Sequence, residues 1–159
     1  MLRNFWVVVS AVLLVSVLMS SWDANPAQAQ VQTVKPLYQR LGGYDAIAAV
    51  VDDFIGRLAT DPKFTKFFVG HGTSSIKKIR QLIVDQLCEV SGGPCYYTGR
   101  DMKTAHAGLG ITETDWNDSV VHLVATLDKF KVPQKEKDEV IGAIAGLKGD
   151  IVDKPMSAK

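Results

Sequence analysis

Apolar side chains recur along this chain at helical spacing, and that periodicity most constrains its fold. In residues 46–58 they fall in adjacent pairs about four residues apart, which places them on one broad helical face. Helical spacing also links the apolar positions within residues 76–90, 116–130 and 140–151. No stretch of the sequence alternates apolar and polar residues with period two. The sequence therefore predicts an all-α domain with no sheet.

Clusters of helix-breaking residues separate the helical segments: residues 42–43, 61–62, 92–94 and 132–133. We expect Ser74 or Ser75 to cap the helix that follows the first polar loop. Thr112 and Asp115 have the spacing of a capping box with aspartate in the acidic position. The last helix is expected to continue from about residue 134 to residue 151.

The segment 92–112 leaves room for only one very short helix, over residues 102–107, with Asp101 or Thr98 available to cap it. A helix of about six residues is not stable alone in water, so other contacts must hold it. His106 is the side chain on this helix that can bind a metal strongly. The alternative interpretation is an ordinary hydrogen-bonded histidine.

Composition narrows the class of protein. The chain has 159 residues, a formal net charge of +1 and 47% hydrophobic residues, which fits one ordinary globular domain. The near-neutral charge argues against a general nucleic-acid binder, because such proteins carry an excess of basic residues.

The N-terminus has the features of a secretory signal peptide. Arg3 precedes an apolar run over residues 7–19, and Ala27-Gln28-Ala29 forms an A-x-A cleavage site. The run is short for a membrane span, and an uncleaved membrane anchor is the alternative. We expect residues 1–29 to be removed and the mature protein to be exported, to the periplasm, without membrane contact. A lead-in, a domain and a tail then remain: residues 30–36, 37–153 and 154–159.

Two cysteines, Cys88 and Cys95, flank the turn at residues 91–94. An oxidising compartment permits a disulfide between them, and two unpaired thiols are the alternative. The spacing is not that of a C-x-x-C motif, which argues against redox catalysis or a zinc knuckle.

Taken in order, the motifs resemble the group 1 truncated haemoglobins over residues 37–152. The matching stretches are Leu37-Tyr38-Gln39-Arg40-Leu41-Gly42-Gly43, residues 51–54, 67–68, 92–94, 97–106 and 110–112, then Trp116 and residues 122–123 and 132–133. The resemblance implies a two-over-two helical sandwich around one haem b.

The resemblance also assigns roles to residues, none of them catalytic. His106 matches the proximal ligand of the haem iron. The other positions expected to contact the haem are apolar: Phe54, Ile55, Phe68, Ile79, Ile83, Met102, Ile111 and Trp116. Lys103 and Arg80 are candidates to pair with the haem propionates, and ordinary solvated charges are the alternative.

The distal side departs from the family pattern. Ile55 stands where the family commonly has tyrosine, and Ile79 and Ile83 stand at its polar distal positions. Gln81 or Gln86 is then the candidate donor to the gas, worth on the order of 1–3 kcal/mol. Without a donor O₂ should leave faster, whereas CO and NO depend on one less. His71 and His122 are weaker candidates for a second ligand.

The function expected from the resemblance is reversible, non-enzymatic binding of O₂, NO and CO at the iron held by His106. This would serve oxygen binding and transport, or NO detoxification with an unidentified reductase. Two alternatives stay open at this point. One is a periplasmic haem module for electron transfer or gas sensing, and the other is a haem-free helical binding domain.

Overall fold

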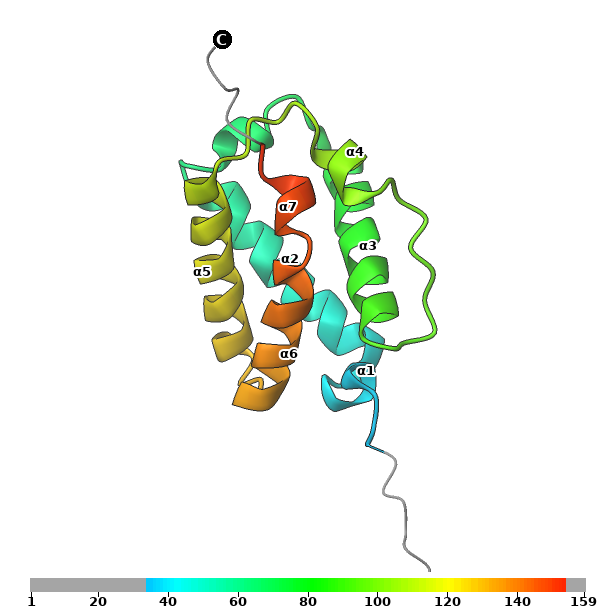
Figure 1. The fold of residues 1–159 in the computed structure, drawn as a ribbon. Coiled ribbons are helices and arrows are strands. Elements are labelled where there is room, and N and C mark those ends of the chain that lie inside the picture. Colours follow the sequence, from blue (N-terminus) through cyan, green and yellow to red (C-terminus); the bar gives the residue numbers. More distant parts are fainter. Residues whose placement is uncertain (1–33, 154–159) are drawn as a thin grey trace, which may run out of the picture. The chain divides into compact units, whose positions relative to one another are not determined.

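The structure, a computed structural model, describes residues 34–153. The expected signal peptide and the C-terminal tail lie outside this range. All regular structure within residues 34–153 is helical, which confirms the all-α prediction (Figure 1). The elements are α1 (Leu37–Arg40), α2 (Gly43–Thr60), the 3₁₀ turn η1 (Thr65–Phe67), α3 (Thr73–Val90), α4 (Met102–His106), α5 (Glu113–Lys129), α6 (Gln134–Ala145) and α7 (Lys148–Ile151). None of these helices combines the length and the apolar character that crossing a membrane requires.

Helix α2 contacts both α3 and α5, so two hydrophobic clusters meet along it. The first cluster joins α2 to α3 and has as its buried members Ile47, Ala48, Val51, Ile55, Val84 and Cys88. The second is built on buried residues of α5 and α6, Leu123, Leu127 and Val140, with Val50 and Phe54 of α2 packed against them. Neighbouring residues on a helix point about 100° apart. The adjacent pairs Val50–Val51 and Phe54–Ile55 of α2 therefore each supply one side chain to each cluster.

Polar contacts also hold α2 against α5. The Asp53 carboxylate accepts hydrogen bonds from Arg57 Nε at 2.7 Å, from Thr126 Oγ1 at 2.9 Å and from Lys129 Nζ. Thr126 is completely buried. The ammonium of Lys129 and then the guanidinium of Arg57 hold the pKa of Asp53 well below its usual range, because both donate to its charged form.

The capping box at the start of α5 is confirmed. Asp115 N–H donates to Thr112 Oγ1 at 3.1 Å, and Thr112 N–H donates to the Asp115 carboxylate at 3.0 Å. The cap predicted for α3 was wrong, because Gly72 takes that position and the helix begins at Thr73. Ser75 lies inside the first turn, where its hydroxyl bonds His71 Nδ1 at 2.8 Å.

Two other predictions need correction. The last helix is interrupted, since α6 ends at Ala145 and α7 begins at Lys148. Gly146 follows α6, and glycine lacks the side chain that would stabilise a continuous helix there. On α5, Trp116, Leu123 and Leu127 are buried as expected, but Val124 and Phe130 are 37% and 40% exposed. Phe130 lies beyond the end of the helix, where the helical spacing no longer sets its direction.

Candidate functional site

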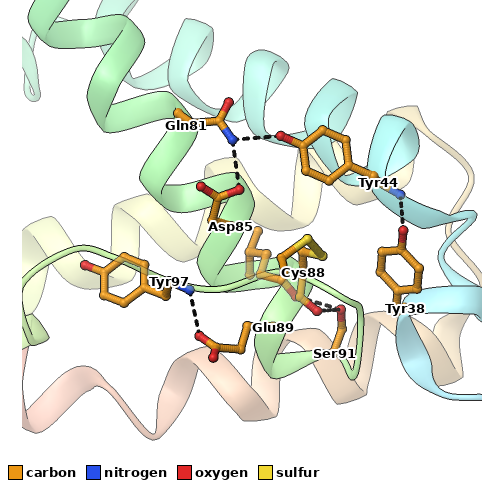
Figure 2. Close-up of a disulfide and its surroundings, with 10 residues drawn as sticks. Tyr38, Tyr44, Gln81, Asp85, Cys88, Glu89, Ser91 and Tyr97 are labelled. Atoms are coloured by element: carbon orange, nitrogen blue, oxygen red, sulfur yellow. Dashed lines mark hydrogen bonds between the residues drawn. A yellow bond between two sulfur atoms is a disulfide. The ribbon is translucent and has the colours of Figure 1, made fainter.

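The chain leaves α3 through a tight turn that a disulfide closes. Cys88, on α3, is bonded to Cys95 in the following loop, with their Cα atoms 5.7 Å apart (Figure 2). Gly93 crosses directly over this bridge. A Cβ atom at Gly93 would lie 2.6 Å from Cys88 Sγ and 2.5 Å from Tyr38 Cδ2, so only glycine fits there.

A small set of hydrogen bonds holds the loop between this turn and α4. The backbone N–H of Tyr97 donates to the Glu89 carboxylate at 3.0 Å, and its hydroxyl donates to the carbonyl of Arg100 at 2.6 Å. Asp101 caps α4, since its carboxylate accepts from Thr104 N–H at 2.8 Å. The sequence had left Asp101 and Thr98 as alternatives for this cap.

His106 is the last residue of α4 and is half-buried. Its Nδ1 lies 2.8 Å from the carbonyl oxygen of Met102. A carbonyl only accepts, so the ring nitrogen must be the donor and Nδ1 carries the proton. Nε2 is then the basic nitrogen, and it makes no hydrogen bond within residues 34–153. A backbone carbonyl on one ring nitrogen commonly orients a histidine whose other nitrogen binds a metal.

The far end of α4 is held by the C-terminal part of the domain. Helix α4 contacts α7. Asp153, just after α7, accepts from Gly110 N–H at 2.7 Å and donates its own N–H to the carbonyl of Ile111 at 2.9 Å. The sequence had suggested that contacts beyond the helix itself must hold it. These contacts supply part of that support, and no local pattern pointed to Asp153.

A set of half-buried apolar side chains belongs to neither hydrophobic cluster. They come from α3, α4, the loop after it, α5, the turn between α6 and α7, and α7: Ile79, Leu82, Met102, Ile111, Val120, Leu147 and Ile151. Trp116, on the first turn of α5, is 8% exposed. Partly open apolar side chains on these elements, together with a histidine that has an available nitrogen on α4, suit a large apolar group with a metal at its centre. The residues present therefore fit haem.

The two isoleucines expected on the distal side, Ile79 and Ile83, lie four residues apart on one face of α3, and both are half-buried. Gln86 follows Ile83 by three residues, so it shares that face, and it is also half-buried. Gln81 does not share it. Figure 2 shows its amide directed at α2 and along α3, where it donates to Tyr44 Oη at 2.7 Å and to Asp85 at 2.8 Å.

Arg80 and Lys103, the two candidates for the propionates, differ in their surroundings. Arg80 donates to both carboxylate oxygens of Asp52 on α2, at 2.7 and 2.9 Å. Its guanidinium is therefore already engaged. Lys103 lies exposed on α4 and forms no ion pair with the described residues. Pairing of Lys103 with a propionate stays a prediction.

The remaining predicted positions lie in or beside the core. Ile55 is 8% exposed and belongs to the first cluster, against which Phe68 packs. Phe54 packs against the second cluster. Their contact with haem stays a prediction.

The other two histidines have partners of their own. His122 Nε2 lies 2.8 Å from the Asp61 carboxylate, and its ring meets Phe64 edge-on at 5.6 Å. His71, in the exposed loop before α3, bonds Ser75. Each of these bonds occupies one nitrogen of the ring in question.

Comparison with known proteins identifies the family to which the chain belongs. Residues 36–153 match the family of bacterial-like globins. The group 1 truncated haemoglobin GlbN of Mycolicibacterium paratuberculosis is 34% identical over 115 residues, covering 72% of this chain and 82% of that protein. GlbN of Nostoc sp. is 30% identical over 118 residues, covering 74% of this chain and 98% of that protein.

Solved structures agree with this placement. The truncated haemoglobin of Tetrahymena pyriformis in the Fe(III) form superposes with a TM-score of 0.69 at 26% identity, covering 76% of this chain and all of that one. The 2/2 haemoglobin of Synechococcus sp., in the cyanomet state with covalently attached haem, gives a TM-score of 0.68 at 28% identity with the same coverage. The chain therefore belongs to the group 1 truncated haemoglobins, the two-over-two globins that bind gases through haem.

Proposed function

We propose that this protein is an exported haem b globin that binds O₂, NO and CO reversibly, with His106 as the protein's single ligand to iron. One observation carries the proposal. His106 Nδ1 lies 2.8 Å from the carbonyl oxygen of Met102, so the proton is on Nδ1 and Nε2 is the basic nitrogen. Only the unprotonated nitrogen of an imidazole binds a metal.

Haem b bound at this position supplies a ferrous iron with an open site for diatomic gases. The chain's own residues set the surroundings of that site. Ile79 and Ile83 present hydrocarbon on their face of α3, which excludes water. Gln86 is the polar side chain on the same face, and its amide makes no hydrogen bond within the described residues. We propose Gln86 as the donor to a polar gas, because the amide of Gln81 is held by Tyr44 and Asp85.

Gas binding is favoured over electron transfer by the number of axial ligands that the chain offers. Electron-transfer haems commonly carry two protein ligands, such as histidine and methionine. The sequence contains 3 histidines, and the two besides His106 are bonded to Asp61 and Ser75. Met102 lies on α4 with His106, one turn earlier, and so cannot approach from the opposite face.

The chemistry of the gas pocket bears on the finer role. A mainly apolar distal face stabilises O₂ less than a tyrosine donor does, while it leaves CO and NO binding nearly unaffected. We therefore propose fast O₂ exchange, suited to oxygen binding and transport. Conversion of NO with O₂ to nitrate would be a further use of the same site, and it would require a partner reductase.

Export to the periplasm is proposed from the leader sequence and supported by the cysteine pair. Disulfides persist in oxidising compartments and are rare in the cytosol. The Cys88–Cys95 bridge suits such a compartment. Intact mass of the protein recovered from the periplasm tests this directly, and retention of residues 1–29 would refute cleavage.

The visible spectrum of protein from haem-replete cells tests the iron ligand. We expect a five-coordinate ferrous spectrum that changes on addition of CO. His106→Gly should lose most of its haem, and imidazole added in solution should restore the Soret band. His71→Ala is the matched control, and it should keep the wild-type spectrum. A six-coordinate ferrous form would favour the electron-transfer or sensing role, and an unaltered Soret band in His106→Gly would refute the assignment.

A further inference from the structure

The two sulfur atoms of the Cys88–Cys95 bridge lie in unequal surroundings. Cys88 has no exposed surface and sits in the first hydrophobic cluster, beneath the backbone of Gly93. Cys95 is only half-buried: it packs against the outside of the same cluster, and its neighbour Tyr96 is 83% exposed. A thiolate attacks one sulfur of a disulfide from the side opposite the sulfur that leaves. Attack on Cys95 therefore comes from the loop side, whereas attack on Cys88 would have to come through the core.

The bridge also holds the segment that leads to His106. Residues 96–101 contain no helix or strand. Two contacts tie the start of this segment to α3, and they leave from adjacent residues of that helix (Figure 2). One is the disulfide at Cys88, and the other is the hydrogen bond from Tyr97 N–H to Glu89 at 3.0 Å, which is exposed to solvent.

Helix α4 has too few residues to be stable without support on both sides. Asp153 holds the side after His106, through Gly110 and Ile111. The disulfide holds the side before it. Without the bridge, two hydrogen bonds to α3 remain on that side. One joins Gly93 N–H to the Cys88 carbonyl at 2.8 Å, at the turn before the loop. The other is the exposed bond to Glu89, which competes with water and contributes little.

We propose that Cys95 is a thiol-exchange site for a dithiol reductant, and that reduction of the bridge loosens the segment carrying His106. The reductant's thiolate bonds to Cys95 Sγ, the Cys88–Cys95 bond breaks, and Cys88 leaves as a thiolate that takes a proton from water. The second thiol of the reductant then displaces Cys95, so the reductant is oxidised by two electrons and both cysteines become thiols. The effect on gas binding rests on the proposed role of His106, whereas the exchange at Cys95 does not.

Hydrogen exchange measured by mass spectrometry on the haem-bound protein tests the loosening. After treatment with dithiothreitol, amides of residues 96–106 should exchange at least about fivefold faster, the lower end of the usual coupling between two sites. Residues of α5 and α6 should not change. A Cys88→Ala, Cys95→Ala double variant should match the reduced protein and not respond to dithiothreitol. If the variant fails to fold, oxidised and reduced wild-type protein still give the comparison.

The iron–histidine stretching frequency of the ferrous protein gives a second readout. It should shift or broaden on reduction of the disulfide, because His106 becomes less tightly held. Unchanged exchange at residues 96–106 would overturn the loosening. An unchanged iron–histidine stretching frequency together with faster amide exchange would show that the loop loosens while His106 stays equally well held. That result would overturn the effect on gas binding.

Two single variants test which sulfur reacts. Cys88→Ala leaves Cys95 alone, and Cys95→Ala leaves Cys88 alone. Incubated with oxidised glutathione, the first should form a mixed disulfide readily and the second should react at least about tenfold more slowly, because thiol exchange depends on access. Equal rates, or faster reaction at Cys88, would overturn the assignment to Cys95. Neither result depends on whether the haem binds gas.

Discussion

Replacing Asp53 by alanine tests how α2 is held against α5. The carboxylate of Asp53 is the hydrogen-bond acceptor for Thr126, a side chain with no exposed surface. It also pairs with Arg57 and Lys129, whose side chains are 33% and 57% exposed. The substitution removes three contacts of different worth, and the structure allows each to be estimated.

The buried hydroxyl dominates the estimate. Leaving a buried polar group without a partner costs about 1–3 kcal/mol. Each exposed ion pair contributes about 0.2–1 kcal/mol, because water screens it. We therefore expect Asp53→Ala to lower the free energy of unfolding by about 2–4 kcal/mol in total.

A double-mutant cycle with Thr126→Val isolates the buried part. Valine removes the hydroxyl and keeps the shape, so Asp53→Ala in that background should lose only the two ion pairs. The coupling energy between Asp53 and Thr126 should be about 1–2 kcal/mol, measured by urea unfolding of the haem-bound protein. A coupling below about 0.3 kcal/mol would refute the argument that this hydroxyl depends on Asp53.

The same carboxylate makes stability depend on pH in a set direction. The pKa of Asp53 is lowered in the folded protein from its ordinary value of 3.8, chiefly by Lys129 and then by Arg57. The stabilisation is therefore fully present above that ordinary value and is lost as the pH falls through 3.8 towards the lower folded value. The difference in unfolding free energy between wild type and Asp53→Asn should narrow below that pH. A difference that stays constant into acid would contradict this assignment.

Three further substitutions have expected outcomes. Ile55→Tyr should slow O₂ dissociation by about 5- to 150-fold if its hydroxyl reaches the gas, with Ile55→Phe as control, and an unchanged stopped-flow rate would mean that another donor is already present. Gly93→Ala should lower the melting temperature and raise the fraction of free thiol, because its Cβ would lie 2.6 Å from Cys88 Sγ; wild-type values would show that the turn has room to adjust. Asp153→Ala should speed haem transfer to an apo-acceptor by about two- to tenfold, since it frees one of the backbone N–H groups after α4. Asp150→Ala, an exposed position on α7, should leave that rate unchanged.

Much of the fold follows from local patterns. The apolar spacing and the breaker residues predicted the helices, and the Thr112–Asp115 pair predicted the start of α5. Each of these signals acts within about four residues, where backbone geometry decides which side chains meet. The sequence also marked His106, and it offered the pairing of Cys88 with Cys95, seven residues apart.

Local patterns of this kind could not predict the contacts between distant parts of the chain. The sequence offered Gln81 as a distal donor, and only the fold shows that its amide bonds Tyr44, 37 residues earlier. The pairing of Arg80 with Asp52 on α2, 28 residues away, likewise appears only in the fold. The exact phase of α3 decides both outcomes, and packing of Val84 and Cys88 against α2 sets that phase.

The short helix that carries His106 shows the same difference between what local patterns predict and what tertiary contacts decide. By itself the sequence determined that α4 is short, that Asp101 was available to cap it and that its histidine could bind a metal. Only the tertiary structure decided what holds it, because Asp153 reaches Gly110 across 43 residues. A hydrogen bond between such distant residues depends on where the intervening helices pack, and no local spacing in the sequence records that.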